Sequence, residues 1–441
     1  MRPNPLAVLI AAALTLSAAP IRAQTVQRAD VEAAASALQA EVLAWRRDIH
    51  AHPELGNRET RTSKLVADHL RKLGLEVKTG VATTGVVAVL KGALPGPRVA
   101  LRADMDALPV TERVDVPFAS KVKSEFRGEP VGVMHACGHD AHTAILMGVA
   151  EALAKMQPTL KGEVLFVFQP AEEGPPDGEP GGATEMLKEG IFRDFKPDAV
   201  FGLHVFSTLS AGQIGVRQGP LMAGSDRFSI KMIGRQTHGA RPWGGIDPIV
   251  ASAELITSAQ SIVSRRTDIS RLPAVVTFGA IKGGVRYNII PDEVDLLGTI
   301  RTFDDKVRQS ILADLKNLAE HVAAANGARV ETHIPEGESN LVTLNDPALT
   351  ARMLPSLQAV AGKDNVIEPA LTMGSEDFSY FAREAPAMYF FVGATPKGRD
   401  PEKAPSNHSP EFFLDESALD LGLRAMLQVT LDYLDGGKAK S

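Results

Sequence analysis

The stretch EVLFVFQPAEEG, residues 163–174, decides the fold of this chain. Its first half, residues 163–168, is a nearly continuous apolar run, and residues 199–203 form a second one. Such runs are typical of parallel strands that are buried on both faces of a sheet. Helical patterns alternate with them along the chain. The sequence therefore predicts an α/β domain with a central, mostly parallel sheet that is covered by helices.

Further elements of this domain lie on both sides of the run. The predicted helices are 30–50, 60–73, 141–156, 347–361 and 415–433, and the predicted strands are 86–90, 99–102 and 387–392. The middle of the chain follows another order, with predicted strands at 228–233, 274–281, 293–299 and 329–334 and helices at 247–265 and 305–325. This β-α-β-β-α-β order is typical of a ferredoxin-like α+β unit.

We therefore expect two domains, one inserted in the other. Residues 221–336 are predicted to form the inserted domain, and residues 30–220 and 337–435 the discontinuous catalytic domain. A chain of 441 residues suits two domains better than one.

The first residues resemble an export signal. Arg2 supplies positive charge, a short apolar run follows, and small residues precede a cut after Ala23, so residues 1–23 are predicted to be a signal peptide. The alternative is an uncleaved amphipathic N-terminus. The apolar run is too short to span a membrane, and we expect a secreted or periplasmic protein without membrane contact after cleavage. A net charge of −6 and 5% aromatic residues make nucleic acid a poor partner.

The single cysteine of the chain, Cys137, lies in MHACGHDAHT, residues 134–143. Export usually favours disulfides, which one cysteine cannot form within the chain. The thiol is therefore either a small buried apolar group or a metal ligand. His139 lies two residues away, on the turn before the helix expected at 141. The positive end of that helix would favour a thiolate.

Polar side chains follow three predicted strands at the points where these strands end. Asp104 and Asp106 follow 99–102, Glu172 and Glu173 follow 163–168, and His204 follows 199–203. In open α/β sheets this edge is where ligands bind. Thiolate, imidazole and carboxylate groups are what zinc and similar divalent metals take as ligands. The sequence therefore predicts a metal-dependent hydrolase with its site at this edge.

The two adjacent glutamates can reach one site only if the chain turns after Gln169, and Pro170 and Gly174 supply that turn. One carboxylate can then bind a metal while the other accepts a proton from the bound water. Two ionised carboxylates so close would repel without a cation between them. A solvated acidic loop is the alternative. Taken alone, His408 and His238 are ordinary exposed loop histidines, and in residues 374–378 Ser375 could cap a helix.

Together these segments resemble the M20 metallopeptidases, and within them the amidohydrolase branch with hippurate hydrolases, N-acyl-amino-acid amidohydrolases and auxin-conjugate hydrolases. The matching segments are residues 49–56, RADMDALP at 102–109, MHACGHDAHT at 134–143, QPAEEG at 169–174, residues 238–242, NIIPDE at 288–293, GSEDF at 374–378 and NHSP at 407–410. They follow one another through nearly the whole chain.

The resemblance implies a site with two divalent metal ions, zinc or manganese, with cobalt or nickel as further candidates. It implies as metal ligands Cys137, His139, Glu173, His204 and His408. It also implies that Glu172 is the general base and that Asp106 stands behind a ligand. Asp104 occupies a position where many M20 peptidases have a metal-binding histidine, and this departure favours the amidohydrolase branch.

The inserted domain resembles the lid and dimerisation domain of the family. The resemblance implies a homodimer in which His238 reaches the partner's active site and steadies the oxyanion, and it implies that Asn288 contacts the substrate. Trp243 follows Arg241-Pro242, where many members of the branch have another sequence. It could reshape the acyl pocket.

We therefore expect an amidohydrolase that cleaves N-acyl or N-aroyl amino acids, or short peptides, with a metal-activated water and a glutamate as general base. One alternative is a dipeptidase or carboxypeptidase of the same superfamily. Another is a non-catalytic periplasmic protein that binds a metal or a solute through a degenerate site.

Overall fold

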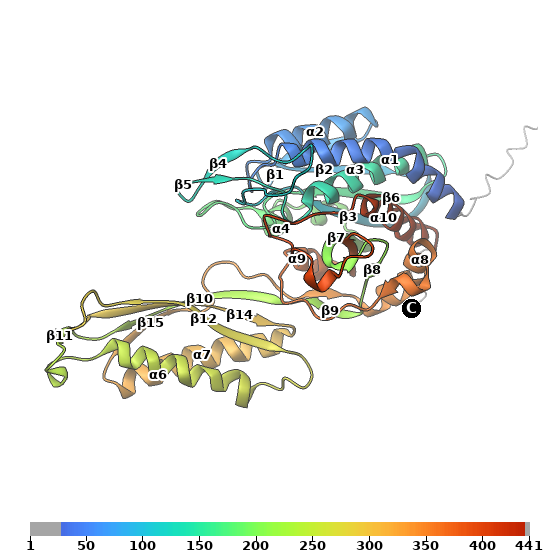
Figure 1. The fold of residues 1–441 in the computed structure, drawn as a ribbon. Coiled ribbons are helices and arrows are strands. Elements are labelled where there is room, and N and C mark those ends of the chain that lie inside the picture. Colours follow the sequence, from blue (N-terminus) through green and yellow to red (C-terminus); the bar gives the residue numbers. More distant parts are fainter. Residues whose placement is uncertain (1–27, 437–441) are drawn as a thin grey trace, which may run out of the picture.

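The computed structural model describes residues 28–436 and shows two domains (Figure 1). The larger domain is built from chain segments that precede and follow the smaller one. The signal peptide predicted at residues 1–23 lies outside the described residues. Within residues 28–436, no helix combines the length and the apolar character needed to cross a membrane.

The larger domain is built around an eight-stranded sheet in the order β1-β2-β6-β3-β7-β18-β8-β17. Its strands are β1 (Glu76–Val81), β2 (Gly85–Lys91), β3 (Leu94–Asp104), β6 (Lys161–Gln169), β7 (Ala199–Ser210), β8 (Ile214–Gly215), β17 (Val366–Ile367) and β18 (Ala387–Thr395). The pairs β3–β6, β3–β7, β7–β18 and β8–β17 are parallel, whereas β1–β2, β2–β6 and β8–β18 are antiparallel. The predicted mostly parallel sheet is confirmed.

Helices cover both faces of this sheet. One face is covered by α1 (Arg28–Ala51), α2 (Thr60–Lys72), α3 (His139–Lys155), α8 (Pro347–Ala361) and α10 (Ser417–Gly436), and the other by α4 (Gly182–Lys188), α5 (Ile191–Phe195) and α9 (Phe378–Glu384). Strand β6 shows why the sheet is buried on both sides. Val164, Phe166 and Phe168 pack into the first core, and Leu165 and Val167 into the second. Each such side chain contributes about 1.5–3 kcal/mol when fully buried.

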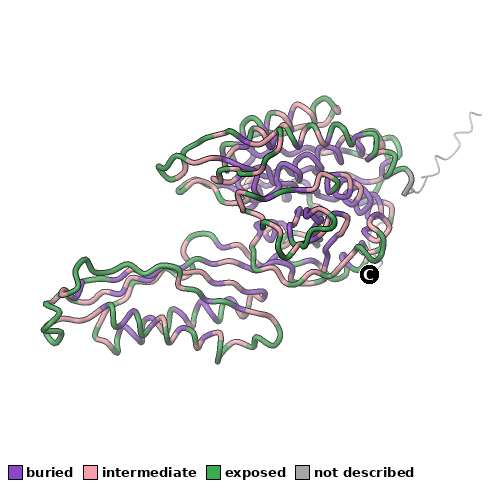
Figure 2. The backbone as a smooth tube through the Cα atoms, in the orientation of Figure 1, coloured by how far each residue is buried: buried purple, intermediate pink, exposed green. Residues whose placement is uncertain are grey.

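The smaller domain contains a four-stranded antiparallel sheet in the order β12-β14-β10-β15. Its strands are β10 (Gly224–Ile233), β12 (Ala274–Gly283), β14 (Glu293–Thr302) and β15 (Arg329–His333), and its helices are α6 (Pro248–Ser261) and α7 (Asp305–Ala325). Both helices pack on one face of the sheet and form a separate core with it, which Figure 2 shows as buried backbone between exposed edges. The elements follow the predicted β-α-β-β-α-β order.

Several short elements had no counterpart in the sequence-based prediction. They include the hairpin of β4 (Lys123–Phe126) and β5 (Glu129–Gly132), the pair β9 (Gly219–Met222) and β16 (Thr343–Asn345), and the pair β11 (Thr237–His238) and β13 (Ile289–Ile290). Helix α3 begins at His139 rather than at residue 141, so this histidine lies in the first helical turn and not on the turn before it.

Candidate active site

Side chains from distant parts of the chain meet at the carboxyl edge of the large sheet. Three of the groups whose possible ligand atoms all lie within 4.8 Å of one another are Cys137, His139 and His204; Cys137, Glu173 and His408; and His139, Glu172 and Glu173. The structure therefore brings together all five side chains that were predicted as metal ligands, together with the predicted base.

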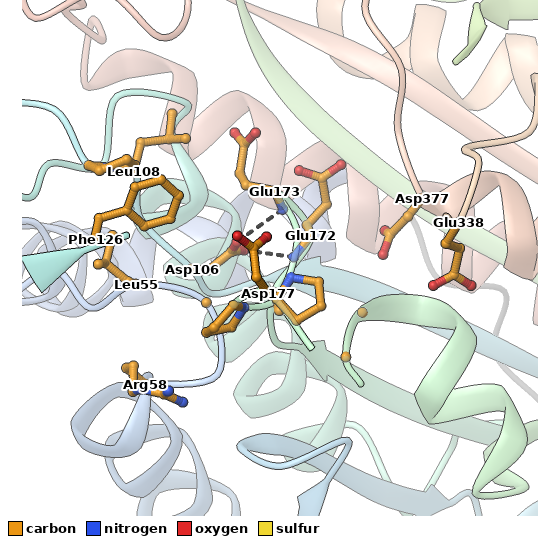
Figure 3. A pocket seen from close by; sticks show the side chains of 18 of the residues that line it. Leu55, Arg58, Asp106, Leu108, Phe126, Glu172, Glu173, Asp177, Glu338 and Asp377 are labelled. Atoms are coloured by element: carbon orange, nitrogen blue, oxygen red, sulfur yellow. Dashed lines mark hydrogen bonds between the residues drawn. The ribbon is translucent and has the colours of Figure 1, made fainter. Parts of the chain in front are cut away.

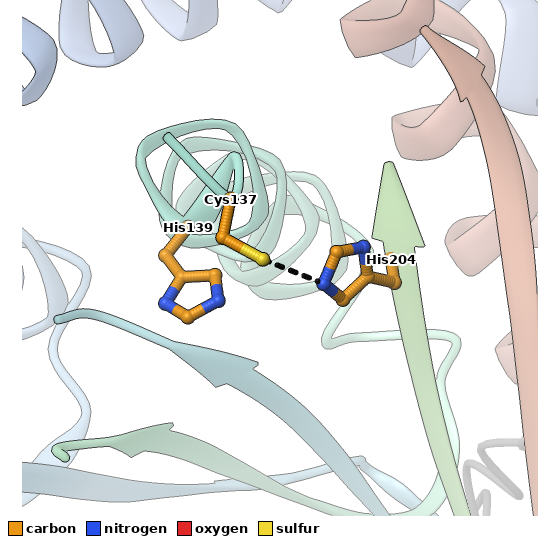
Figure 4. Close-up of side chains that lie close together, drawn as sticks. All are labelled: Cys137, His139 and His204. Carbon is orange, nitrogen blue, oxygen red and sulfur yellow. Dashed lines mark hydrogen bonds between the residues drawn. The ribbon is translucent and has the colours of Figure 1, made fainter. Parts of the chain in front are cut away.

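Cys137 lies between two histidines. Its Sγ is 3.3 Å from His204 Nε2, a contact drawn as a dashed line in Figure 4, and 3.2 Å from His408 Nε2. Gly138 makes this approach possible, because it has a φ of 97° and an added Cβ would lie 2.2 Å from Val205 Cγ2. The turn before α3 can thus lie directly against β7. His204 Nδ1 donates to the carbonyl of Val205 at 2.7 Å, which leaves Nε2 facing the thiol.

The two glutamates are held by one carboxylate. The backbone N–H groups of Glu172 and Glu173 donate to the two carboxylate oxygens of Asp106 at 3.1 and 3.0 Å (Figure 3). His139 Nδ1 donates to the Asp106 carbonyl at 2.8 Å and lies 3.2 Å from its carboxylate. The turn itself uses a positive φ of 50° at Ala171. Asp106 therefore stands behind His139 and also fixes both glutamates.

Two buried atoms of the cluster have no hydrogen-bond partner among residues 28–436: His139 Nε2 and Glu173 Oε1. The Glu173 atom lies 3.0 Å from His408 Nε2 but outside hydrogen-bond geometry. His139 Nε2 is 3.9 Å from the nearest Glu172 oxygen. Buried polar atoms without partners are rare in folded proteins. A cation among these imidazoles, carboxylates and the thiol would satisfy both atoms, so the residues fit a metal.

His142 is also buried beside the cluster, but its two nitrogens are already used. Val205 N donates to Nε2 at 2.9 Å, and Nδ1 donates to Asp104 at 2.6 Å. The lone pair of this imidazole is therefore occupied by a backbone N–H group. His142 positions β7 and Asp104 and is a poor metal ligand.

Without a cation, the surrounding side chains favour the protonated forms of Cys137 and Glu172. Burial, together with Glu173 and Glu172, raises the pKa of the Cys137 thiol well above its usual range. Burial and Glu376 likewise raise the pKa of Glu172 well above normal. Burial and the carboxylates thus oppose the effect of the helix terminus, which was expected to favour a thiolate. A bound divalent cation reverses this balance, since a coordinating thiol is deprotonated.

Their surroundings shift the pKa values of His139 and His204 in opposite directions. Burial lowers the pKa of His139, but Asp104 and Asp106 outweigh it and raise that pKa to about 10. Burial, with His142 beside it, lowers the pKa of His204 well below its usual range. The imidazole of His204 is thus held neutral, which is the form that binds metals.

A cleft of about 770 Å³ opens beside the cluster. Asp106, Glu172 and Glu173 line it on the larger domain, and Ser225 and Arg227 of β10 line it on the smaller domain. The two glutamates therefore separate the buried imidazoles and thiol from a space that can hold a small molecule.

Comparison with known proteins identifies the family. Residues 100–432 match Peptidase family M20/M25/M40. The chain belongs to this family. The predicted family is confirmed, as is the predicted enzyme class, a metallo-hydrolase of amide bonds.

Its M20 relatives carry several names. The chain is 41% identical to thermostable carboxypeptidase 2 of Saccharolobus solfataricus over 89% of this chain and 95% of that protein. It is 40% identical to the N-acyl-L-amino acid amidohydrolase of Geobacillus stearothermophilus over 70% of this chain and 80% of that protein. Among solved structures, a dinuclear metal binding peptidase of the M20 family from Bacillus subtilis has a TM-score of 0.73 at 33% identity and covers 91% of this chain and 99% of its own.

The smaller domain of this M20 chain carries the other predicted site residues at its far end. His238 is exposed on β11, and the Asn288 carbonyl beside it accepts a hydrogen bond from Gly239 N at 2.8 Å. Figure 1 shows β11 at the end of the smaller domain that points away from β7 and α3. Trp243 lies near it with 77% of its surface exposed. Within one chain, the structure does not bring His238, Asn288 or Trp243 to the metal-ligand cluster.

Sequence reasoning missed the fully buried Arg102 at the centre of the sheet edge. Its guanidinium contacts Asp104 at 2.6 Å, Glu376 at 2.8 Å and Asp377 at 3.0 Å, and its Nε donates to Gln169 at 2.8 Å. The signal was present in the segments RADMDALP and GSEDF, which contain Asp104, Glu376 and Asp377 of this network. Ser375 does not cap α9 through its side chain.

Proposed function

We propose that this chain is an amidohydrolase that cleaves N-acyl or N-aroyl amino acids with the help of two divalent cations. The cations would be held by Cys137, His139, Glu173, His204 and His408. The observation that carries this proposal is that two buried atoms, His139 Nε2 and Glu173 Oε1, have no hydrogen-bond partner among residues 28–436 and lie beside a thiol and two further imidazoles. Zinc suits the thiolate and imidazoles, manganese suits the carboxylates, and cobalt or nickel also fits such a mixed set.

When bound, the cations supply Lewis-acid chemistry that activates a water and polarises the amide carbonyl. Glu172 lies between the cleft and the proposed metal ligands. It lines the cleft, and one of its oxygens lies 3.9 Å from His139 Nε2. It takes a proton from the attacking water and passes it to the leaving amine. Asp106 holds Glu172 and His139 in position relative to each other, because it accepts hydrogen bonds from both.

The smaller domain completes the site in a homodimer. His238 of one protomer enters the cleft of its partner and donates to the oxyanion, and Asn288 beside it contacts the substrate. The end of the domain that carries them exposes Trp243, Val285 and Tyr287, of which the last two are 97% and 93% exposed. Exposed apolar side chains that gather in this way are typical of a surface that another molecule covers.

The predicted signal peptide makes the mature enzyme secreted or periplasmic. Mass spectrometry of the exported protein is expected to show a chain that begins at Gln24. An intact residue 1–23 segment on protein recovered from the cytoplasm would contradict this location.

Glu172→Gln tests the mechanism. The variant is expected to bind the same amount of metal as the parent and to lose at least about a hundredfold in kcat, because the proton acceptor is gone. Glu338→Gln is the matched control, since Glu338 lines the same cleft outside the metal-ligand cluster. Hydrolysis by Glu172→Gln at close to the parent rate would show that another group is the base.

Cys137→Ala tests the metal site itself. Elemental analysis of the purified variant is expected to show fewer cations per chain, because a thiolate ligand has been removed. An unchanged stoichiometry would exclude Cys137 from the ligands.

A second candidate is a carboxypeptidase, since two thermostable carboxypeptidases are 41% and 40% identical to this chain. A panel of hippurate, N-acetyl amino acids, indole-acetyl conjugates and dipeptides separates the two. The amidohydrolase is expected to have the higher kcat/KM on N-acyl amino acids. A clear preference for peptides with a free amino terminus would favour the peptidase.

A further inference from the structure

The cleft has an apolar wall and a polar wall on opposite sides of its two glutamates. Leu55, Leu108 and Phe126 are half-buried side chains that lie together on one side (Figure 3). Asp377 and Glu338 lie on the other side of Glu172 in the same view. A substrate in this cleft therefore meets a different chemistry at each end.

The apolar wall is assembled from three segments that are fixed to one another. Leu55 forms an isolated parallel β-bridge with Ala107. Leu108 and Met134 exchange two backbone hydrogen bonds, each 3.0 Å long. Phe126 closes the wall from the end of β4. It comes from the hairpin that the sequence did not predict.

An ion pair joins the hairpin to the loop that follows the glutamates. Arg127 Nη2 lies 3.1 Å from Asp177, which comes four residues after Glu173, and its guanidinium carbon lies 5.2 Å from the centre of the Phe126 ring. An exposed pair of this kind contributes little to stability. It places the Arg127 guanidinium near both Asp177 and the Phe126 ring, and all three residues line the cleft.

Strand β10 offers the cleft one cation that is unpaired within the described chain. Of the three arginines that line the cleft, Arg58 pairs with Glu179 at 2.6 Å and Arg127 pairs with Asp177. The exposed guanidinium of Arg227 makes no ion pair with any residue between 28 and 436. A planar guanidinium that is free in this way is well suited to bind a carboxylate through two parallel hydrogen bonds.

The two glutamates set the direction of the substrate. The carboxylate of Glu172 lies within 4.8 Å of those of Glu376 and Asp377, whereas that of Glu173 lies with Cys137 and His408. If Glu172 protonates the leaving amine, the amine lies on the Asp377 side. The acyl group, on the other side of the scissile carbonyl, then extends past Glu173.

We propose that Leu55, Leu108 and Phe126 bind an apolar acyl group longer than acetyl, and that Arg227 pairs with the carboxylate of the amino-acid half. This assignment rests on the proposed amidohydrolase function. It names the substrate class as amino acids that carry a medium-length aliphatic or an aromatic acyl group. Each methylene that becomes buried is worth about fourfold in kcat/KM.

A series of N-acyl alanines tests the apolar wall on the metal-loaded, full-length enzyme. The parent is expected to show a kcat/KM that rises from acetyl to butyryl, hexanoyl and benzoyl. Phe126→Ala is expected to reduce the ratio of hexanoyl to acetyl kcat/KM by about tenfold, and Phe126→Leu should restore most of it. Phe413→Ala, at an exposed phenylalanine outside the cleft, is the matched control. An unchanged ratio in Phe126→Ala would overturn the assignment.

A matched pair of substrates tests Arg227. Arg227→Gln is expected to raise the KM for N-hexanoyl-alanine about tenfold, with a much smaller change for the corresponding carboxamide, which has no negative charge. Arg58→Gln is the control, because that arginine already pairs with Glu179. Equal changes for acid and amide would exclude carboxylate pairing.

The outcomes separate this inference from the function on which it rests. If the metal-loaded parent hydrolyses no member of the series, the proposed amidohydrolase function fails. If it hydrolyses them while the variants keep the parent's chain-length and charge preferences, only the assignment of the two walls fails.

Discussion

The edge of the large sheet and the far end of the smaller domain hold their polar side chains in different ways. At the edge, His139 and His204 are buried, and the Nδ1 of each bonds to a backbone carbonyl: that of Asp106, just after β3, for His139, and that of the neighbouring Val205 for His204. At the far end, His238 is exposed, and its Nδ1 accepts a hydrogen bond from Ala240 N, two residues away. The histidines at the sheet edge are oriented by the surrounding core, whereas His238 is oriented only by its own turn.

This difference indicates which part of the site is ordered within one chain and which part needs a second surface. A buried cluster must have its charges balanced by the fold itself, because an unpaired charge in the core is costly. An exposed imidazole is solvated and costs nothing, but it orients a reacting group only when another surface comes to it. The buried edge is therefore expected to affect both stability and activity, and the far end activity alone.

The largest effect on stability is expected from Arg102→Met. Removing this guanidinium leaves Asp104, Glu376 and Asp377 buried without their cation, and breaking such a group costs about 3–5 kcal/mol. Urea unfolding followed by circular dichroism measures the loss. Arg98→Met is the matched control on the same strand, because its half-exposed side chain forms an ion pair worth about 0–1 kcal/mol. Equal losses in both variants would show that the edge does not depend on the buried charge.

Much of the buried edge could be predicted because its signals are local. Gln169 to Gly174 and His204 directly follow apolar strands, and parallel strands bring their carboxyl ends to one edge. Cys137 and His139 precede a clear helical pattern. These residues could be placed in one site from the order of elements alone, before any contact was known.

The parts that could not be predicted depend on contacts between distant segments. The hairpin that carries Phe126 is short and mostly polar, so it has no apolar periodicity, and its Arg127 meets Asp177, which is 50 residues away in the sequence. In the sequence alone, Arg102 looks like an ordinary residue at the end of a strand. Its partners Glu376 and Asp377 lie more than 270 residues away, so only the folded chain shows the network.

His238→Ala tests the far end of the smaller domain. It is expected to lower kcat by about 10²–10³, the usual loss when an oxyanion donor is removed. The free energy of unfolding should stay within about 0.5 kcal/mol of the parent, because the side chain is exposed. His321→Ala, at an exposed histidine on α7, should change neither quantity.

Mixing two inactive variants shows whether the effect crosses between protomers. Co-expressed His238→Ala and Glu172→Gln chains are expected to recover activity, since a mixed dimer contains one cleft with an intact base and a partner that supplies the histidine. Mixed chains that stay inactive would place His238 outside the partner's site. The far end of the smaller domain would then not belong to the active site at all.

An effect that is small within any one pH unit and builds up over several units is expected from a single buried proton at the sheet edge. Glu59, at the start of α2, accepts hydrogen bonds from Thr84 Oγ1 at 2.5 Å and from Ala171 N at 2.8 Å. Burial, with Asp106 nearby, raises the pKa of Glu59 to about 8. An unfolded glutamate has a pKa of about 4.3, so between these values the folded chain holds one more proton than the unfolded chain. The free energy of unfolding therefore falls as pH rises through this window, by up to about 1.4 kcal/mol per pH unit.

Glu59→Gln removes that proton exchange while it keeps a group that can bond to both partners. Its unfolding free energy is expected to depend less on pH between about 5 and 8, with a gain over the parent at pH 8 and little difference at pH 5. Asp68→Asn, on the exposed side of the same helix, is the control, because its ion pair with Lys64 holds the pKa of Asp68 below its usual range and outside this window. Parallel pH profiles for the parent and Glu59→Gln would mean that Glu59 is already ionised in the fold. The carboxylates at the edge would then be stabilised more strongly than their protein neighbours alone can account for, as expected if cations remain bound there throughout.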